Sequence, residues 1–245
     1  MGLGYGQAGA LREVLRSGEW NERKLAVCDL GSQRVFPKEV NRILNTTLSG
    51  TDVPAGQIYS ALGFQSYTSI DLDGADGAKR FDLNKSLEIT YGFSEQFDLV
   101  CNFGTAEHIF DQAVFFSNVH QLTKTGGLML HSLPSRGWVN HGFYRYDSVM
   151  TQDLAEANGY ETVYINRAHR YRPRFLNRWA AREPKLVHVL ASALSLFGLT
   201  RKNTSIIVVF KKNSDSAFVQ PIQGMYSYLR DAFSEAADPN TFNEL

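Results

Sequence analysis

The stretch Lys24-Leu-Ala-Val-Cys-Asp-Leu-Gly-Ser-Gln33 determines how the rest of the chain is interpreted. It predicts a short buried strand that stops at Asp29-Leu30-Gly31, because an apolar run too short for a helix and ended by glycine suits a central strand of a parallel sheet. Glycine there lets the backbone turn sharply and approach a ligand closely. Ligands of open α/β sheets lie outside the carboxyl ends of the strands. The turn after Leu30 is therefore the first candidate binding element.

The composition limits the classes of function. The 245 residues carry 25 Lys and Arg against 25 Asp and Glu, so a formal charge of zero gives no reason to expect nucleic-acid binding. Both cysteines, Cys28 and Cys101, lie in apolar runs and are expected to be buried thiols rather than a disulfide or ligands. A reducing cytoplasm fits this, and cytoplasmic is the expected location. The start of the chain lacks the pattern of a secretory signal, and no apolar run reaches the roughly 20 residues that span a bilayer.

Strands and helices are expected to alternate along the chain. The predicted strands are 24–30, 67–71, 78–83, 97–103, 128–133, 161–165 and 204–211, and the predicted helices are 8–16, 37–48, 55–62, 105–122, 148–158 and 186–197. The alternation up to Asn158 predicts an α/β fold with a doubly wound, mostly parallel sheet. We expect a single domain (1–245), made of an N-terminal arm and helix (1–20), a core (24–165), a basic and apolar cap (166–203), and a last strand with a tail that packs back over the domain (204–245).

The N-terminal run Gly4-Tyr-Gly-Gln-Ala-Gly9 matches the dinucleotide-binding fingerprint in form only. No strand precedes it, and without that strand the glycines have no phosphate-binding context. We expect a mobile arm that leads into the first helix.

Polar residues or glycines follow four of the predicted strands. They are Asp29 with Gly31, Asp71, Asp82 with Leu83, and Asn102 with Gly104. Each one alone is also explained by capping of the next helix. Together they are expected to lie along one edge of the sheet.

The motifs at these strand ends are Val27-Cys-Asp-Leu-Gly31, Ser69-Ile-Asp71, Phe81-Asp-Leu83, Phe97-Asp-Leu-Val100, Gly104-Thr-Ala-Glu-His108 and Leu122-Thr-Lys-Thr-Gly-Gly-Leu-Met-Leu130. In this order and spacing they resemble the class I S-adenosylmethionine-dependent methyltransferases. The resemblance covers about Lys24 to Lys211. It implies a seven-stranded sheet with an antiparallel last strand, S-adenosyl-L-methionine as the cofactor, and transfer of its methyl group to an acceptor.

The resemblance also implies a role for each strand end. Gly31 passes the methionine part of the cofactor, Asp29 orients its ammonium group, Asp71 accepts the two ribose hydroxyls, Asp82 takes the adenine amino group, Leu83 packs on the ring, and Asn102, Phe103 and Gly104 line the sulfonium side. Ser32, Gln33 and Leu72 belong to the same expected site.

The first turn departs from the family pattern. After Gly31 the family usually has another glycine, whereas this chain continues Ser32-Gln33-Arg34. Arg34 could pair with the cofactor carboxylate, or the altered turn could mean lost activity. The alternative hypothesis is therefore a non-catalytic protein of the same fold that binds or scaffolds another enzyme. A nicotinamide-dependent oxidoreductase would need a glycine-rich turn here, and Gly31 is the single glycine.

The acceptor side is predicted in the loops after the strands 97–103 and 128–133. The second loop, Ser132 to Tyr146, is long and aromatic, as functional loops often are. It contains His141, whose ordinary pKa suits a general base near neutral pH. His108 and Tyr144 are the other candidate catalytic residues, and a purely structural role is the alternative for each. No two histidines have the His-x-x-x-His spacing, and no metal site is predicted.

Residues 167–185 are strongly basic, and a mostly apolar helix follows. Arginines at this density favour a phosphate- or carboxylate-bearing partner. We expect a small-molecule acceptor, anionic or sugar-like, that is methylated on oxygen or nitrogen. A membrane-surface contact through 167–199 and a homodimer seam formed by the apolar helix are the alternatives.

Overall fold

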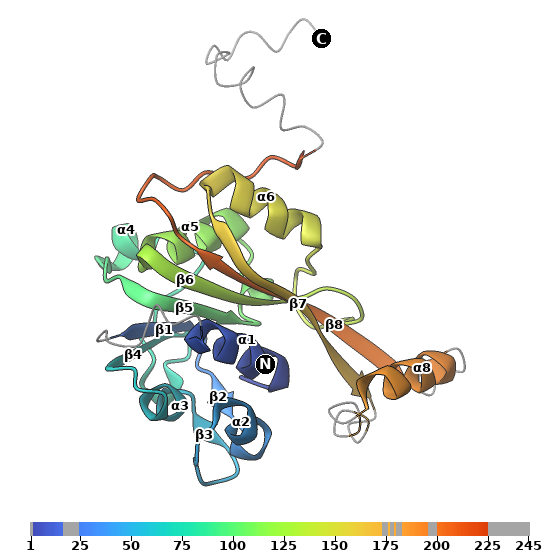
Figure 1. Ribbon diagram of the computed structural model, residues 1–245. Coiled ribbons are helices and arrows are strands. Elements are labelled where there is room, and N and C mark those ends of the chain that lie inside the picture. The colour runs from blue at the N-terminus through green and yellow to red at the C-terminus, as the bar shows by residue number, and fades with distance from the viewer. Residues whose placement is uncertain are drawn as a thin grey trace, which may run out of the picture.

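A computed structural model describes residues 2–16, 25–172, 176, 179, 183–195 and 200–224. Its main sheet has six strands in the order β4-β1-β5-β6-β8-β7 (Figure 1). The strands β1 (Ala26–Leu30), β4 (Ser66–Ile70), β5 (Phe97–Phe103) and β6 (Thr123–Pro134) are parallel. The strand β8 (Arg201–Lys211) runs antiparallel between β6 and β7 (Glu161–Arg172). The predicted α/β sheet with an antiparallel last strand is confirmed.

The predicted count of seven strands is wrong, because 78–83 does not form a strand. Only Lys79 makes a bridge to the sheet, opposite Ile70. Beyond it, the backbone N–H of Asp82 donates to the Tyr91 hydroxyl at 2.9 Å, and Phe81 stacks on the same tyrosine ring. Side-chain contacts therefore replace the strand pairing that the apolar pattern predicted.

Helices cover both faces of the sheet (Figure 1). One core cluster lies between the sheet and α1 (Tyr5–Arg16), α2 (Pro37–Leu44) and α3 (Gly56–Ala61). The other lies beneath α4 (Leu87–Tyr91), α5 (Gln112–Leu122) and α6 (Ser148–Asn158). A small second sheet pairs β2 (Arg34–Val35) with β3 (Val53–Pro54).

Two predicted helices are shorter than expected. The helix α2 ends at Leu44 because Asn45 adopts a left-handed backbone conformation, with φ 52°. The helix α5 begins at Gln112, where the Asp111 side chain accepts a hydrogen bond from the N–H of Val114 at 3.0 Å. The residues before it form the single turn η2 (Ala106–His108). This turn, rather than a continuous helix from Thr105, follows β5.

The first residues are packed on the domain and do not form the expected mobile arm. Leu3 is buried and bridges to Val35. At the start of α1, Gly6 lies so close to the sheet that a Cβ there would come within 2.7 Å of the Ala168 Cβ and 2.8 Å of the Ile207 Cδ1. The absence of a side chain at Gly6 lets α1 contact β7 and β8 directly.

The hairpin of β7 and β8 is longer than the predicted strands 161–165 and 204–211. Pro134 pairs with Ser205, which pairs with Ala168, so the last part of the hairpin extends past the end of β6. The helix α8 (Pro184–Ser195) lies at its far end (Figure 1). Part of the predicted cap is thus a strand extension that projects from the carboxyl edge of the sheet.

The expected packing of the tail on the domain holds for its described residues. Phe218 lies against His120, with ring centroids 6.0 Å apart, and the N–H of Val219 donates to the Asn158 Oδ1 at 2.8 Å. The Lys212 Nζ, also buried, donates to the carbonyls of His120 and Thr123 at 3.0 Å each. Lys24, the end of the helix predicted to Phe197, and the chain after 224 lie outside the described residues.

Candidate active site

The turn after β1 is joined directly to the end of β4. Gly31 has a φ of 101°, a conformation that glycine adopts without strain. Its N–H donates to the Ile70 carbonyl at 2.7 Å, and the N–H of Ser32 donates to the Asp71 Oδ2, also at 2.7 Å. A Cβ on Gly31 would lie 2.5 Å from the Thr105 Oγ1, which comes from the turn after β5. Three strand ends thus meet at this glycine.

The side chains of Gln33 and Arg34 are both held by contacts within the protein. The Gln33 side chain is buried, and its Nε2 lies 3.5 Å from the Leu30 carbonyl and 2.7 Å from where a Gly31 Cβ would be. The Arg34 guanidinium pairs with Asp52 at 2.9 Å and with Asp76 at 2.8 Å, and these carboxylates raise its pKa. The positive charge in the turn is therefore already compensated by the protein.

Asp29 lies beneath the turn rather than in it. Its buried carboxyl accepts hydrogen bonds from the Tyr59 hydroxyl at 2.9 Å and the Tyr67 hydroxyl at 3.3 Å. Burial raises the pKa of Asp29 to about 7, against the lowering effect of these hydrogen bonds. Its hydrogen-bond partners are the hydroxyl groups of two tyrosines. Asp29 would therefore affect a ligand only through the position of the turn above it.

Asp71, which follows β4, and Asp82, which lies in the segment that forms no strand, differ in the oxygen atoms that they leave free for a ligand. One Asp71 oxygen is used by Ser32, whereas the other has only a long 3.5 Å contact with the N–H of Asp73. Leu72 is 65% exposed beside it. The Asp82 Oδ1 accepts both the backbone N–H and the side-chain amide of Asn84 at 2.9 Å, and these bonds lower the pKa of Asp82.

The remaining predicted cofactor residues are mostly buried. Leu83 and Phe103 belong to the two core clusters. The Asn102 Oδ1 accepts hydrogen bonds from the N–H groups of Thr105 and Ala106 at 3.1 Å each, and its amide contacts the His131 Nδ1 at 3.2 Å. Asn102 therefore shapes the turn after β5, and Gly104, with φ 82°, forms that turn.

A cluster of Glu107, His108 and His141 lies just past Gly104. The Glu107 side chain is fully buried, and its Oε1 lies 3.3 Å from the His141 Nε2. The rings of His108 and His141 meet edge to face, with centroids 5.1 Å apart. Burial raises the pKa of Glu107 to about 7 and lowers the pKa of both histidines. Two predicted catalytic residues, separated by 33 positions in the chain, are thus brought together.

The loop after β6 holds His141 against Glu107 through its backbone. The N–H groups of Phe143 and Tyr144 both donate to the Glu107 carbonyl, at 2.7 and 3.3 Å. Asn140, just before the histidine, has a left-handed φ of 57°. The third catalytic candidate, Tyr144, uses its hydroxyl to donate to the Phe110 carbonyl at 2.9 Å.

The same loop is attached to the projecting hairpin. The N–H of Ser135 donates to the Thr204 carbonyl at 2.8 Å, and the Trp138 indole N–H donates to the same oxygen at 3.0 Å. Trp138 in turn packs on His141, with ring centroids 4.8 Å apart. The exposed arginines of the loop and of β7 are Arg136, Arg145, Arg167 and Arg170. The charge of Arg170 contributes to the lowered pKa of His141, after burial and His108.

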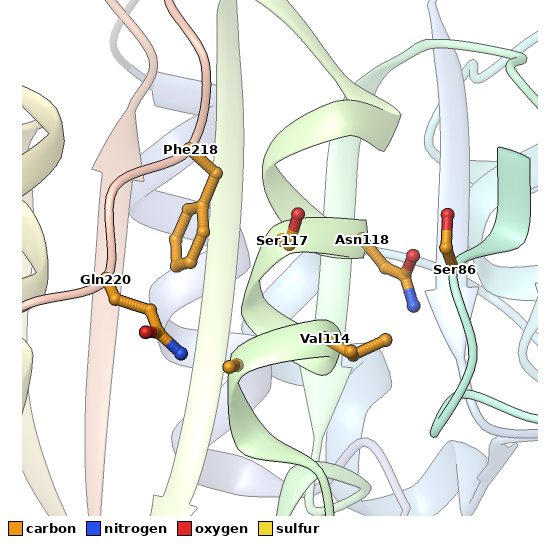
Figure 2. Close-up of a pocket in the computed structure, with 7 residues that line it drawn as sticks. Ser86, Val114, Ser117, Asn118, Phe218 and Gln220 are labelled. Atoms are coloured by element: carbon orange, nitrogen blue, oxygen red, sulfur yellow. The ribbon is translucent and has the colours of Figure 1, made fainter. Parts of the chain in front are cut away.

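A separate pocket of about 250 Å³ lies between α5 and the tail (Figure 2). It is lined by Ser86, Ala113, Val114, Ser117, Asn118, Phe218 and Gln220. None of these side chains is acidic, basic or a histidine, and none belongs to the predicted site. The pocket is therefore separate from the candidate site.

Glu107 is the site residue that the sequence-based prediction left out. Its position beside His108 in the turn after a strand was the available signal. The sequence could not show that its carboxylate is buried and faces a loop more than 30 residues away.

Comparison with known proteins gives the family. A family model described as a methyltransferase domain matches residues 4–184. The chain belongs to this methyltransferase family. It is a class I S-adenosylmethionine-dependent methyltransferase, as the ordered strand-end motifs predicted.

Two solved structures share the fold at low sequence identity, and a third is similar with a lower score. The YcgJ protein from Bacillus subtilis is 14% identical, over 85% of this chain and 99% of that one, with a TM-score of 0.50. TehB from Haemophilus influenzae is 10% identical over 84% of this methyltransferase and 62% of its own length, also with a TM-score of 0.50. An O-methyltransferase of a Brevibacillus brevis trans-AT polyketide synthase, in complex with S-adenosyl-L-homocysteine, is 16% identical over 87% and 75%, with a TM-score of 0.46.

A further comparison and a search of the described residues for membrane-spanning helices are both negative. A search of curated proteins finds no match to this methyltransferase. Among the residues that the structure describes, no helix is both long and apolar enough to cross a membrane.

Proposed function

We propose that this methyltransferase binds S-adenosyl-L-methionine along the carboxyl edge of its sheet and transfers the methyl group to an oxygen or nitrogen of a small anionic molecule. The observation that carries the proposal is the direct joining of the strand ends. The Asp71 carboxylate accepts the N–H of Ser32, while Gly31 stands within contact distance of the turn after β5. Residues from β1, β4 and β5 thereby form one continuous rim.

We infer from this rim which residues would bind the cofactor. Asp71 has one carboxylate oxygen with only a weak contact, which suits an acceptor for ribose hydroxyls. Asp82, whose pKa is lowered, is an ionised acceptor at the adenine end, next to Leu83. Gly31 and Gly104, both with left-handed φ, leave room for a ligand that passes close to the backbone.

The acceptor side would be formed by the loop after β6 and the projecting hairpin. The exposed arginines named above give this side a positive charge, which favours an anionic acceptor. The cluster of Glu107, His108 and His141 begins in the turn just after Gly104, and the charge of Arg170 acts on His141, so it is the place where an acceptor proton would leave. The methyl group needs no further activation, because the sulfonium already makes it reactive, and alignment of the two reactants supplies much of the catalysis.

Product formation with labelled cofactor is the test. S-adenosylmethionine carrying a deuterated methyl group would be incubated with a panel of phosphate- and carboxylate-bearing alcohols and amines, together with neutral analogues, and products would be detected by mass spectrometry. We expect labelled product from an anionic compound, and at least a several-fold loss of product in Asp71→Ala but not in the surface control Glu161→Ala. Cofactor binding without product from any compound would instead support the non-catalytic alternative.

A further inference from the structure

The Glu107 carboxylate lacks the partners that a buried acid normally has. Among the described residues, the buried side-chain nitrogen and oxygen atoms without a hydrogen bond are the two Glu107 oxygens and the His141 Nε2. An unpaired buried polar group costs about 1–3 kcal/mol, and a charged one costs more. The Glu107 Oε1 and the His141 Nε2 lie 3.3 Å apart without forming a hydrogen bond, and the second Glu107 oxygen has no contact of this kind. Three such atoms side by side suit a bound group that satisfies them together.

We propose that Glu107, His108 and His141 bind a divalent transition-metal ion. Each residue offers one ligand atom, and these atoms all lie within 4.8 Å of one another. Metal bonds of about 2.0–2.2 Å place neighbouring ligands of a tetrahedral ion some 3.5 Å apart, so a modest closure of the cluster completes the site. His108 is exposed and able to make that adjustment, while Glu107 is fixed by its burial.

The ligand types define the class of ion. Two imidazoles and one carboxylate suit Zn²⁺, and with open positions they also suit Fe²⁺, Mn²⁺ or Co²⁺. Mg²⁺ and Ca²⁺ prefer sets made of oxygen ligands, so they are the less suitable ions. Three protein ligands leave at least one position open, as in catalytic rather than structural sites. Histidine spacing could not reveal this site, because the ligands come from two separate loops and the expected spacing applies to a single helix.

The surroundings hold the ligands in place. Two backbone hydrogen bonds from the loop after β6 end on the Glu107 carbonyl, and a Cβ on Gly142 would lie 2.9 Å from the Glu107 Cγ. The nearby Tyr146 hydroxyl donates to the Gln112 Oε1 at 2.7 Å, so it does not satisfy the carboxylate. If the proposed function holds, the open position would take an oxygen of the acceptor, lower its pKa and remove the need for a free histidine base.

Titration of the metal-free protein, without cofactor, tests the site. After dialysis against a chelator, Co²⁺ would be added while the visible absorption of the bound ion is recorded, and Zn²⁺ would then be added in competition. We expect saturation at one ion per chain and displacement of Co²⁺ by Zn²⁺. Glu107→Gln and His141→Ala should each weaken binding by at least about tenfold, whereas the control His169→Ala should bind like the wild type.

Circular dichroism of each variant would show that it is folded. Absence of saturable Co²⁺ and Zn²⁺ binding by the folded wild type would overturn the proposal, as would unchanged binding in both folded ligand variants. Because no cofactor is present, neither result depends on whether the proposed methyl transfer is correct.

Discussion

At the scale of single residues, the site region contains two buried carboxyl groups, Asp29 and Glu107, which differ in their hydrogen bonds. Asp29 accepts hydrogen bonds from two tyrosine hydroxyls, whereas Glu107 has no hydrogen-bond partner for its carboxylate among the described residues. Strand alternation predicts that Asp29 faces the opposite side of the sheet from its neighbours Cys28 and Leu30. Its partners Tyr59 and Tyr67 lie 30 and 38 positions further along the chain, so the sequence alone could not identify them.

Burial of Asp29 predicts a specific dependence of stability on pH. The pKa of this residue is raised to about 7 in the folded state, from about 3.8 when unfolded. As pH rises from 4 to 7, the unfolded chain loses the proton first and becomes relatively more stable. The wild type should therefore lose up to about 4 kcal/mol relative to Asp29→Asn over this range and no more above it. Urea unfolding of both proteins at several pH values measures the difference. Parallel stability curves would show that Asp29 is ionised in the folded protein.

At the scale of helices and strands, close contacts at glycines determine how these elements pack against one another. The sequence predicted the first helix but not its docking, because the glycines near the N-terminus match a ligand-binding pattern in form. In the structure Gly6 is a packing residue, whereas a Cβ added to Gly9 in the same helix would have no neighbouring atom within 4 Å.

These two glycines provide a matched pair of substitutions. Gly6→Ala should lower the free energy of unfolding by about 1–3 kcal/mol, because the methyl group would push α1 away from Ala168 and Ile207. Gly9→Ala should raise it by about 0.5–1 kcal/mol, because alanine favours a helix interior and meets no obstacle. Denaturant unfolding measures both. Equal effects of the two substitutions would contradict the close docking of α1.

A second pair tests the attachment of the loop after β6 to the hairpin. Gly137 and Gly77 have similar left-handed φ values, 88° and 83°, but only Gly137 is crowded, with the Lys202 carbonyl 2.7 Å from where its Cβ would be. Alanine at either position costs about 1–2 kcal/mol for the backbone conformation alone. Gly137→Ala should cost at least about 1 kcal/mol more than Gly77→Ala. Thermal unfolding of the two variants checks this, and equal costs would mean that the loop is free of the hairpin.

At the scale of the whole molecule, the candidate functional residues gather at one edge of the sheet. The alternation of apolar runs and glycine turns was sufficient to predict a mostly parallel α/β sheet, and the resemblance to the methyltransferase family supplied the antiparallel last strand. It was insufficient for 78–83, where an aromatic contact replaces strand pairing, and for the hairpin, whose polar and basic residues do not follow a buried strand pattern. The strand-end residues could be identified from sequence because topology places them, whereas the Glu107 cluster depends on how two loops fold against each other.

Calorimetric titration of S-adenosylhomocysteine into the folded protein tests the central claim most directly. Binding at one site per chain is predicted for the wild type, weakened at least several-fold in Asp71→Ala, because that carboxylate holds the first turn and, in the proposed cofactor site, would accept the ribose hydroxyls. The matched surface variant Glu161→Ala should bind like the wild type. Heat signals no greater than dilution for the folded wild type, with S-adenosylmethionine giving the same result, would contradict a cofactor site at this edge of the sheet.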